Sequence, residues 1–187
     1  RPLEKPLRLS TGLISEATEA RASVTVRVNG RTATGNGMIY LSDLWAWPDT
    51  SLTHEARDVA LRALTEEIGA HLSWLCGGEP AHPLELGLRL NAAVCDRGGP
   101  PALACAMCGS PFDAALHDAV GQALGVSAFR LYDVDCVLPS ADPLFPDGAA
   151  RAIRGVLTSP RTRLDAWWIV GSSDSIQEDV GPAVAQG

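Results

Sequence analysis

Residues Ser110–Val126 read SPFDAALHDAVGQALGV and carry the clearest helix start signal in the sequence. Ser110 followed by Pro111 is typical of a helix start, because serine caps free N–H groups and proline fits the first helical turn. Asp113 places a carboxylate in that same turn, which favours the start further. Gly125 predicts the helix end, since glycine readily adopts the left-handed conformation found there. The apolar residues recur at helical spacing and are expected to face a core: Phe112, Ala115, Leu116, Ala119 and Ala123.

Further helices are predicted upstream of this stretch. One is expected from Pro83 to Val94, with His82 as its entry residue. A short helix of small residues is expected over Ala102–Met107, closed by Cys108 and Gly109. Before both, an amphipathic helix carries an apolar stripe at spacings of three and four residues: Leu61, Leu64, Ile68, Leu72 and Leu75.

The first forty residues are predicted to form strands. Residues 22–28 alternate apolar and polar side chains, which is typical of a half-buried antiparallel strand. Asn29-Gly30 predicts a two-residue type I′ turn, because both central positions of that turn need a positive φ. The returning strand is residues 31–40, and the apolar run of residues 3–10 is the first strand. The fold class is therefore predicted as α+β, with a three-stranded antiparallel meander followed by a helical bundle.

Composition excludes several classes of protein. The chain has 187 residues, about one domain, and its net charge of −7 argues against nucleic acid as the main partner. No apolar run approaches the roughly 20 residues of a membrane-spanning helix, so no membrane partner is expected. Lys5 is the single lysine among 15 cationic residues, which leaves one candidate for a lysine base or a Schiff base. An odd number of cysteines without a secretory signal indicates free thiols and a cytoplasmic location.

The short motifs offer no convincing active site by themselves. Cys105 and Cys108 match a C-x-x-C pattern, but no second cysteine or histidine pair accompanies them. Two buried helix residues are therefore expected there, not a redox or zinc site. His117 lies four residues after Asp113, which favours a helix hydrogen bond over a catalytic dyad. His54 is interpreted as a solvated helix residue, and no G-x-S-x-G, H-E-x-x-H or Walker motif is present.

The C-terminal part of the chain differs in composition. Residues 134–163 are rich in Pro, Asp and small residues and are predicted to be a linker, with a short helix near residues 148–157. Leu164–Val170 is typical of a buried strand, and Ile176–Ala185 of a helix. A terminal strand and helix are half of a βαβ unit and lack a parallel partner strand, so a larger second domain is expected to continue. The domain boundaries are accordingly predicted as 1–133, 134–163 and 164–187.

This order of elements resembles the N-terminal capping domain of the enolase superfamily, in its mandelate racemase and muconate lactonizing branch. The resemblance is specific over residues 109–131, where a small residue, Asp, Ala-Leu, a bulky residue, Asp and a Gly-x-x-Leu-Gly ending follow one another. It implies that residues 164–187 begin a (β/α)7β barrel whose remainder lies beyond Gly187. The capping domain's main partner would then be its own barrel domain, and a homo-oligomer is compatible with the family.

The resemblance also implies an activity. Enzymes of this branch are Mg2+-dependent acid-sugar dehydratases, racemases, epimerases or cycloisomerases, which remove the proton α to a carboxylate. The expected substrate is thus a small-molecule carboxylate, and Mg2+ stabilises the enediolate that forms. The Lys and His acid/base residues and the three metal carboxylates of the family belong to the barrel. No catalytic or metal-binding residue is therefore assigned in this chain, and the Mg2+ ligands are expected outside it.

Two loops are expected to contact the substrate, because in the family they close over the barrel mouth. By position they are residues 11–14, between the first two strands, and residues 44–47, after the third. For the two tryptophans of the second loop, packing beneath the next helix is the competing interpretation. The substrate-binding residues that the resemblance implies are Thr11, Leu13, Ile14, Trp45 and Trp47.

Two other functions stay open on the sequence. The chain can be a non-catalytic α+β binding or scaffolding module that uses the tryptophan loop as a partner surface. A thiol-redox protein is the third reading, and the lone C-x-x-C supports it poorly. The sequence beyond Gly187 separates the first two, since a Lys-x-Lys followed by three spaced acidic residues selects the enzyme and a stop codon selects the module.

Overall fold

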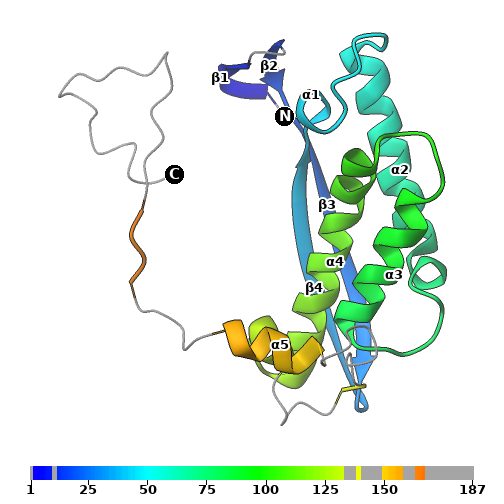
Figure 1. Ribbon diagram of the computed structural model, residues 1–187, viewed down its shortest axis with the longest axis vertical. Coiled ribbons are helices and arrows are strands. Elements are labelled where there is room, and N and C mark those ends of the chain that lie inside the picture. The colour runs from blue at the N-terminus through cyan, green and yellow to red at the C-terminus, as the bar shows by residue number, and fades with distance from the viewer. Residues whose placement is uncertain (1, 10–11, 133–137, 140–148, 158–162, 167–187) are drawn as a thin grey trace. The chain divides into compact units, whose positions relative to one another are not determined.

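The computed structural model describes residues 2–9, 12–132, 138–139, 149–157 and 163–166 (Figure 1). The chain separates into two units, residues 1–157 and residues 158–187. In the second unit the described residues, 163–166, form no helix or strand. The rest of the predicted strand Leu164–Val170 and the whole predicted helix Ile176–Ala185 lie outside the described residues.

The first unit is α+β, with two antiparallel two-stranded sheets and a set of helices. The predicted short helix near residues 148–157 is confirmed within the segment interpreted as a linker. The first unit contains these elements in chain order: β1 Pro2–Leu9, β2 Gly12–Glu16, β3 Thr18–Val28, β4 Arg31–Leu41, α1 Asp43–Ala46, α2 His54–Leu75, α3 Pro83–Cys95, α4 Ala102–Leu124, the 3-10 helix η1 Ala128–Tyr132, and α5 Ala149–Val156.

The predicted hairpin is confirmed as β3 and β4. Asn29 has a φ of 50° and Gly30 a φ of 80°, as the type I′ turn requires. The two strands pair without interruption from Thr18 opposite Leu41 down to the turn. Small and branched apolar residues of β3 alternate with exposed polar ones and are buried: Ala20, Ala22 and Val24.

The predicted three-stranded meander is wrong in its pairing. β1 pairs with β2 and β3 pairs with β4, and no ladder joins the two sheets within the described residues. Residues 15–21, which lie outside the predicted strands, are almost entirely strand, because β3 already begins at Thr18. β1 therefore finds its partner in the adjacent β2. Pro6 within β1 has no N–H to donate, which suits a strand with an unpaired edge.

The two helices predicted on either side of Gly109 are in fact one helix, α4, with Pro111 inside it. Pro111 has no N–H for the carbonyl of Met107, four residues earlier. The Ser110 hydroxyl donates to that carbonyl instead, at 3.0 Å, so the helix continues. Its end is as predicted, with Gly125 at a φ of 70°.

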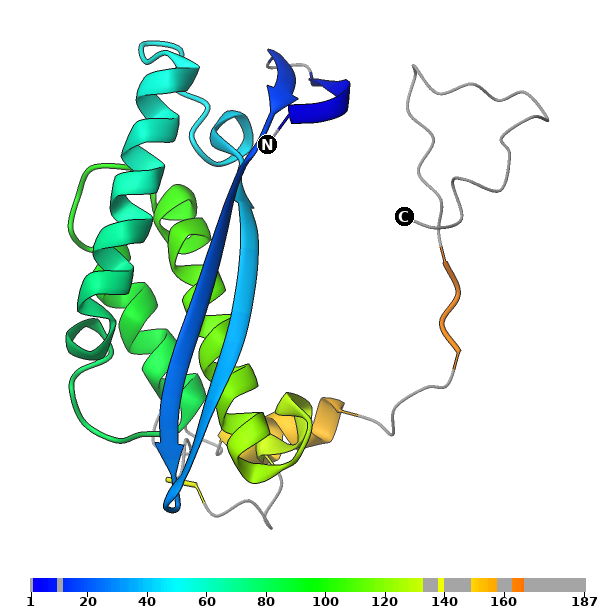
Figure 2. The same ribbon diagram turned by 180° about the vertical axis from the view of Figure 1, so that it is seen from behind.

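α4 lies directly against the hairpin, and glycines permit this approach (Figure 2). A Cβ on Gly35 would lie 2.1 Å from the backbone nitrogen of Ala119, and one on Gly37 would lie 2.0 Å from the carbonyl oxygen of Pro111. These glycines therefore bring the two backbones into contact. On its other sides α4 packs against α2 and α3.

The helices α2 and α3 confirm the predicted bundle. The Thr53 hydroxyl caps α2 by accepting from the Ala56 N–H at 3.1 Å. His82 enters α3 as expected, and its side chain caps the helix by accepting from the Leu84 N–H. Three residues of the α2 stripe are buried in the core: Leu61, Ile68 and Leu75.

Candidate functional site

A cavity of about 440 Å³ lies at the end of the hairpin remote from its turn. Its lining comes from β1, β2, the start of β3, the end of β4, the start of α1 and the first turns of α2. In Figure 1 these elements lie at one end of the hairpin. Its wall combines apolar side chains such as Leu3 and Ile14 with the charged side chains of Asp43, His54 and Arg62. Four separate chain segments therefore meet at one mixed polar and apolar pocket.

A buried ion pair underlies this pocket. Asp43 in α1 is 3% exposed and Arg57 in α2 is 5% exposed. The Nε and Nη2 atoms of Arg57 each lie 2.9 Å from Oδ2 of Asp43. The other carboxylate oxygen, Oδ1, lies 2.9 Å from Nδ1 of His54. Both oxygens of the buried carboxylate are thus engaged, which compensates for its removal from water.

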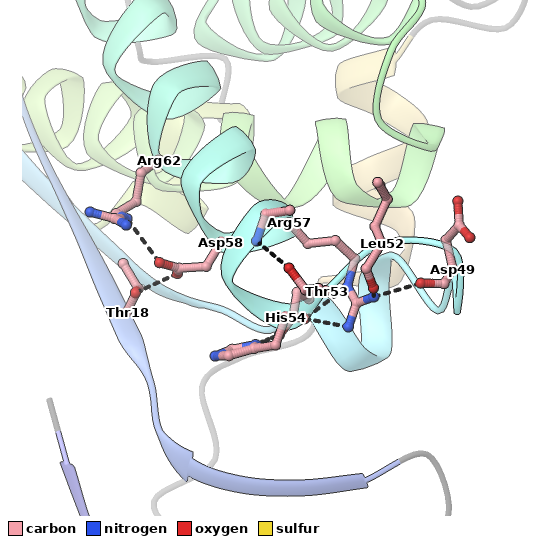
Figure 3. Close-up of polar contacts among 10 residues, drawn as sticks. Thr18, Asp49, Leu52, Thr53, His54, Arg57, Asp58 and Arg62 are labelled. Atoms are coloured by element: carbon pink, nitrogen blue, oxygen red, sulfur yellow. Dashed lines mark hydrogen bonds and ion pairs between the residues drawn. The ribbon is translucent and has the colours of Figure 1, made fainter.

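Arg57 also holds the loop that joins α1 to α2. Its Nη1 donates to the carbonyl oxygens of Asp49 and Leu52, each at 2.5 Å (Figure 3). The loop is closed further by Ser51, whose N–H and hydroxyl donate to the Asp49 carboxylate at 2.8 and 2.6 Å. These hydrogen bonds lower the pKa of Asp49. The loop is therefore folded around one guanidinium group.

A second polar layer links α2 to the hairpin. The Thr18 hydroxyl donates to Oδ1 of Asp58 at 2.6 Å, and Nε of Arg62 donates to Oδ2 at 2.9 Å (Figure 3). The side chains of Arg62 and His54 are each 50% exposed, whereas those of Asp43 and Asp58 are mostly covered. The exposed carboxylate of Glu16 also lines the pocket, so its solvent-facing charge is mixed, and Arg62 is the group that suits an anionic ligand atom.

The structure divides the five residues expected to contact substrate. Ile14 lines the pocket, while Leu13 is 55% exposed and Thr11 lies outside the described residues. Trp45 is 62% exposed on α1. Trp47 is half-buried against the core and lines a different cavity, beside α2 and the end of α3. The two tryptophans, treated together on the sequence, therefore have different environments.

The sequence analysis missed Asp43, Arg57 and Arg62, and took His54 for a solvated residue. One signal could have identified Arg57. It lies four residues before Leu61 and so continues the apolar stripe of α2, and a charged residue on a buried stripe needs a partner. Nothing in the sequence indicated that Asp43, fourteen residues earlier, is this partner.

The C-x-x-C cysteines are buried, as expected. Cys105 is 2% exposed and Cys108 is 0% exposed. Burial raises the pKa of both thiols, which disfavours the reactive thiolate. The Cys108 thiol donates to the carbonyl of Leu61 at 3.6 Å, which ties α4 to α2. These residues belong to the core, and their environment is unlike that of a redox pair.

Comparisons with protein-family models, with curated proteins and with solved structures found no match. No helix in the described part of the chain is long and apolar enough to cross a membrane. The described residues also contain no group of three or more His, Cys, Asp or Glu side chains that could hold a metal ion. They do not fit a Mg2+ site, so we derive no chemical step through a metal.

Proposed function

We propose that residues 1–133 are the capping domain of an enolase-superfamily lyase or isomerase of the mandelate racemase and muconate lactonizing branch. Such an enzyme removes the proton α to a carboxylate with Mg2+, using residues of a barrel outside this chain. One observation carries the proposal. The two segments that the resemblance assigns to substrate closure, residues 11–14 and 44–47, lie next to one pocket: Ile14 lines it, and so do Ser42 and Asp43, which directly precede the second segment.

The side chains at this end of the domain suit three different roles. Leu13 and Trp45 expose large apolar surfaces, which suit the exclusion of water above a polar substrate. Arg62 provides a half-exposed donor that suits a carboxylate or hydroxyl group, and Nε2 of the half-exposed His54 can accept from a hydroxyl, because Nδ1 of that ring donates to Asp43. Arg57 acts beneath them as a positioning residue, because it holds α1 and the following loop in place.

A cytoplasmic location is part of this proposal. The four cysteines in the described residues are free thiols, which suits a reducing compartment. The non-catalytic binding module remains the alternative, because the exposed Trp45 and Leu13 would serve a protein partner equally well.

The test uses the full-length protein, including the sequence beyond Gly187. We expect a Lys-x-Lys segment followed by three spaced acidic residues, and Mg2+-dependent exchange of the α proton of an acid-sugar carboxylate into D2O, followed by NMR. A downstream sequence without these residues, or no exchange across a panel of acid sugars, would contradict the enzyme and favour the binding module.

Substitution of the tryptophans then tests the lid. Trp45→Ala is expected to lower kcat/KM by at least about tenfold with little loss of stability, because Trp45 is exposed. Trp47→Ala is expected to cost about 3 kcal/mol of stability, because Trp47 packs against the core. If neither change alters substrate preference in the folded fraction, the loop is not a lid.

A further inference from the structure

A second cavity, of about 370 Å³, lies between α3 and α4 and is closed at one side by η1. It is separate from the pocket at the end of the hairpin and shares no lining residue with it. Most of its wall is apolar and includes Leu84, Leu88 and Val94 of α3. Asn91 and Ser110 also line it, and three further polar side chains lie together at one end: Asp113, His117 and Tyr132. An apolar cavity with a few converging polar groups is the usual form of a small-molecule site, and this volume is near the lower end of the usual range of about 300–1,000 Å³.

Two glycines show where α3 and α4 touch and where they leave space between them. A Cβ on Gly87 would lie 2.0 Å from Oδ1 of Asp113, so α3 and α4 touch at that level. Gly109 lines the cavity and is buried, yet a Cβ placed on it would meet nothing within 4 Å. A buried position with open space beside it is unusual in a close-packed interior. The helices therefore touch at Gly87 and leave room for another group at Gly109.

The polar end of the cavity is only partly satisfied by the protein. Nδ1 of His117 lies 2.9 Å from the backbone oxygen of Asp113, and because a carbonyl only accepts, Nδ1 carries a proton. The other ring nitrogen, Nε2, lies 3.5 Å from the Tyr132 hydroxyl, at the outer limit of a hydrogen bond. Nε2 is then an acceptor, so a hydroxyl supplied by a ligand could donate to it and accept from the Tyr132 hydroxyl at better distances.

The charges around this end balance one another. Burial lowers the pKa of His117, but the hydrogen bonds and the charge of Asp113 outweigh it, so the pKa is raised overall. Oδ1 of Asp113 lies 3.4 Å from Nδ1, so the imidazolium form has its counter-ion beside it. Burial lowers the pKa of His82, whose ring lies tilted by 36° against that of Tyr132. An anionic ligand would lie beside the like charge of the Asp113 carboxylate.

We propose that this cavity binds a small neutral molecule with an apolar body and one hydroxyl group. The body lies on the apolar wall from α3 and over Gly109, and the hydroxyl donates to Nε2 of His117 and accepts from the Tyr132 hydroxyl. The site belongs to the folded unit of residues 1–157 and does not depend on the proposed enzyme activity.

Benzyl alcohol serves as the probe, in an NMR titration of the whole 187-residue chain. We expect saturable shifts of the His117 ring protons and the Gly109 amide. Toluene lacks the oxygen and is expected to bind about fivefold to tenfold more weakly, the usual contribution of one hydrogen bond. Benzoate is expected to bind at least about tenfold more weakly, because its carboxylate would lie beside the like charge of Asp113. Equal binding of all three molecules, or no saturable shift, overturns the proposal.

Variants locate the binding. Gly109→Leu fills the open space and should abolish benzyl alcohol binding while the circular dichroism spectrum stays native, and Gly109→Ala should weaken it in part. Gly69→Ala, a glycine change in α2 outside the cavity, is the matched control and should bind normally. Tyr132→Phe keeps the ring on His82 but should weaken benzyl alcohol, not toluene, about fivefold. Unchanged binding by a folded Gly109→Leu protein overturns the assignment, and so does equal weakening of both probes by Tyr132→Phe.

Discussion

The cluster of Asp43, His54 and Arg57 and the cluster of Asp113, His117 and Tyr132 are built from similar side chains. In the first, both oxygens of a buried carboxylate and three guanidinium nitrogens have partners within 3 Å. In the second, the carboxylate is about half exposed and the histidine and tyrosine meet only at 3.5 Å.

The first cluster therefore suits a structural role, whereas the second suits ligand binding or a change of protonation. A fully paired buried ion pair is costly to break, because removing one partner leaves an uncompensated charge. A partly satisfied cluster can instead accept a ligand or change its protonation at small cost. We therefore expect changes in the first cluster to alter stability, and changes in the second to alter binding and titration.

The largest expected effect comes from Arg57→Ala. It leaves the carboxylate of Asp43 buried without its main partner and should cost about 3–5 kcal/mol in the free energy of unfolding, measured in urea. Arg62→Ala is the control and should cost less than about 1 kcal/mol, because its pair with Asp58 is half exposed.

A double-mutant cycle checks the cause of that loss. Asp43→Ala combined with Arg57→Ala should be less destabilising than the sum of the single changes by about 1–3 kcal/mol, because neither charge is then left alone. Additive losses would mean that the two residues act independently, and the assignment of a clamp would fail.

The next effect concerns His82, which touches Tyr132 of the second cluster. His82 is 4% exposed, caps α3 through Nδ1 and donates from Nε2 to the carbonyl of Leu131 at 3.3 Å. His82→Ala should cost about 1–2 kcal/mol by loss of the cap. His82→Asn retains a capping group and should recover part of the loss. Equal unfolding free energies for the Ala and Asn variants would exclude the cap as the cause.

The dependence of stability on pH distinguishes the two buried histidines. His82 has a pKa below its ordinary value of 6.5. Its contribution to the free energy of unfolding is therefore present above pH 6.5 and is lost as the pH falls through the folded-state pKa. His117 has a raised pKa, so its contribution is present below pH 6.5 and is lost as the pH rises through the folded-state pKa.

As the pH falls, the contribution of His82 to the free energy of unfolding decreases, whereas that of His117 increases. His117→Asn removes the contribution of His117. In that variant the unfolding free energy should fall more steeply than in the wild type as the pH drops from about 7 to 5. Urea unfolding at a series of pH values measures this slope. An unchanged or shallower slope would mean that His117 does not titrate as the geometry suggests.

The smallest effect on stability is expected from Gly87→Ala. The new Cβ would displace the end of the Asp113 side chain, which can rotate into solvent. Stability should change by less than about 1 kcal/mol, because alanine also favours the helix. The pKa of His117 should fall in an NMR titration, since the carboxylate moves away from the ring. Asp113→Asn should lower that pKa as well, and a His117 pKa unchanged in both variants would contradict the ion pair.

The candidate site was only partly predictable from the sequence. Ile14 was expected at the site and lines the pocket, whereas Trp47 lies against the core. Of the two segments that the resemblance indicated, 11–14 contributes Ile14 to the pocket, whereas none of residues 44–47 lines it, and the charged residues were not indicated. Asp43 and Arg57 belong to different elements, and no local pattern indicates that a loop will fold back to join them.

The conformational preferences of adjacent residues were sufficient to predict several elements. The Asn29-Gly30 turn, the apolar stripe of α2 and the end of α4 at Gly125 all follow from conformational preferences of a few adjacent residues. These preferences act over one turn of chain, so the sequence by itself determined them, together with the α+β class.

Only the tertiary structure decided how these elements continue and pair. Ser110 and Pro111 are a strong local helix start, yet α4 runs through them, because the Ser110 hydroxyl replaces the missing N–H and the Pro111 backbone packs on Gly37. The strand pairing, the Asp43–Arg57 ion pair and the cavity beside Gly109 likewise depend on contacts between distant residues. Such contacts form between whole faces of helices and strands, and the energy of a local signal of about 1 kcal/mol is too small to overrule them.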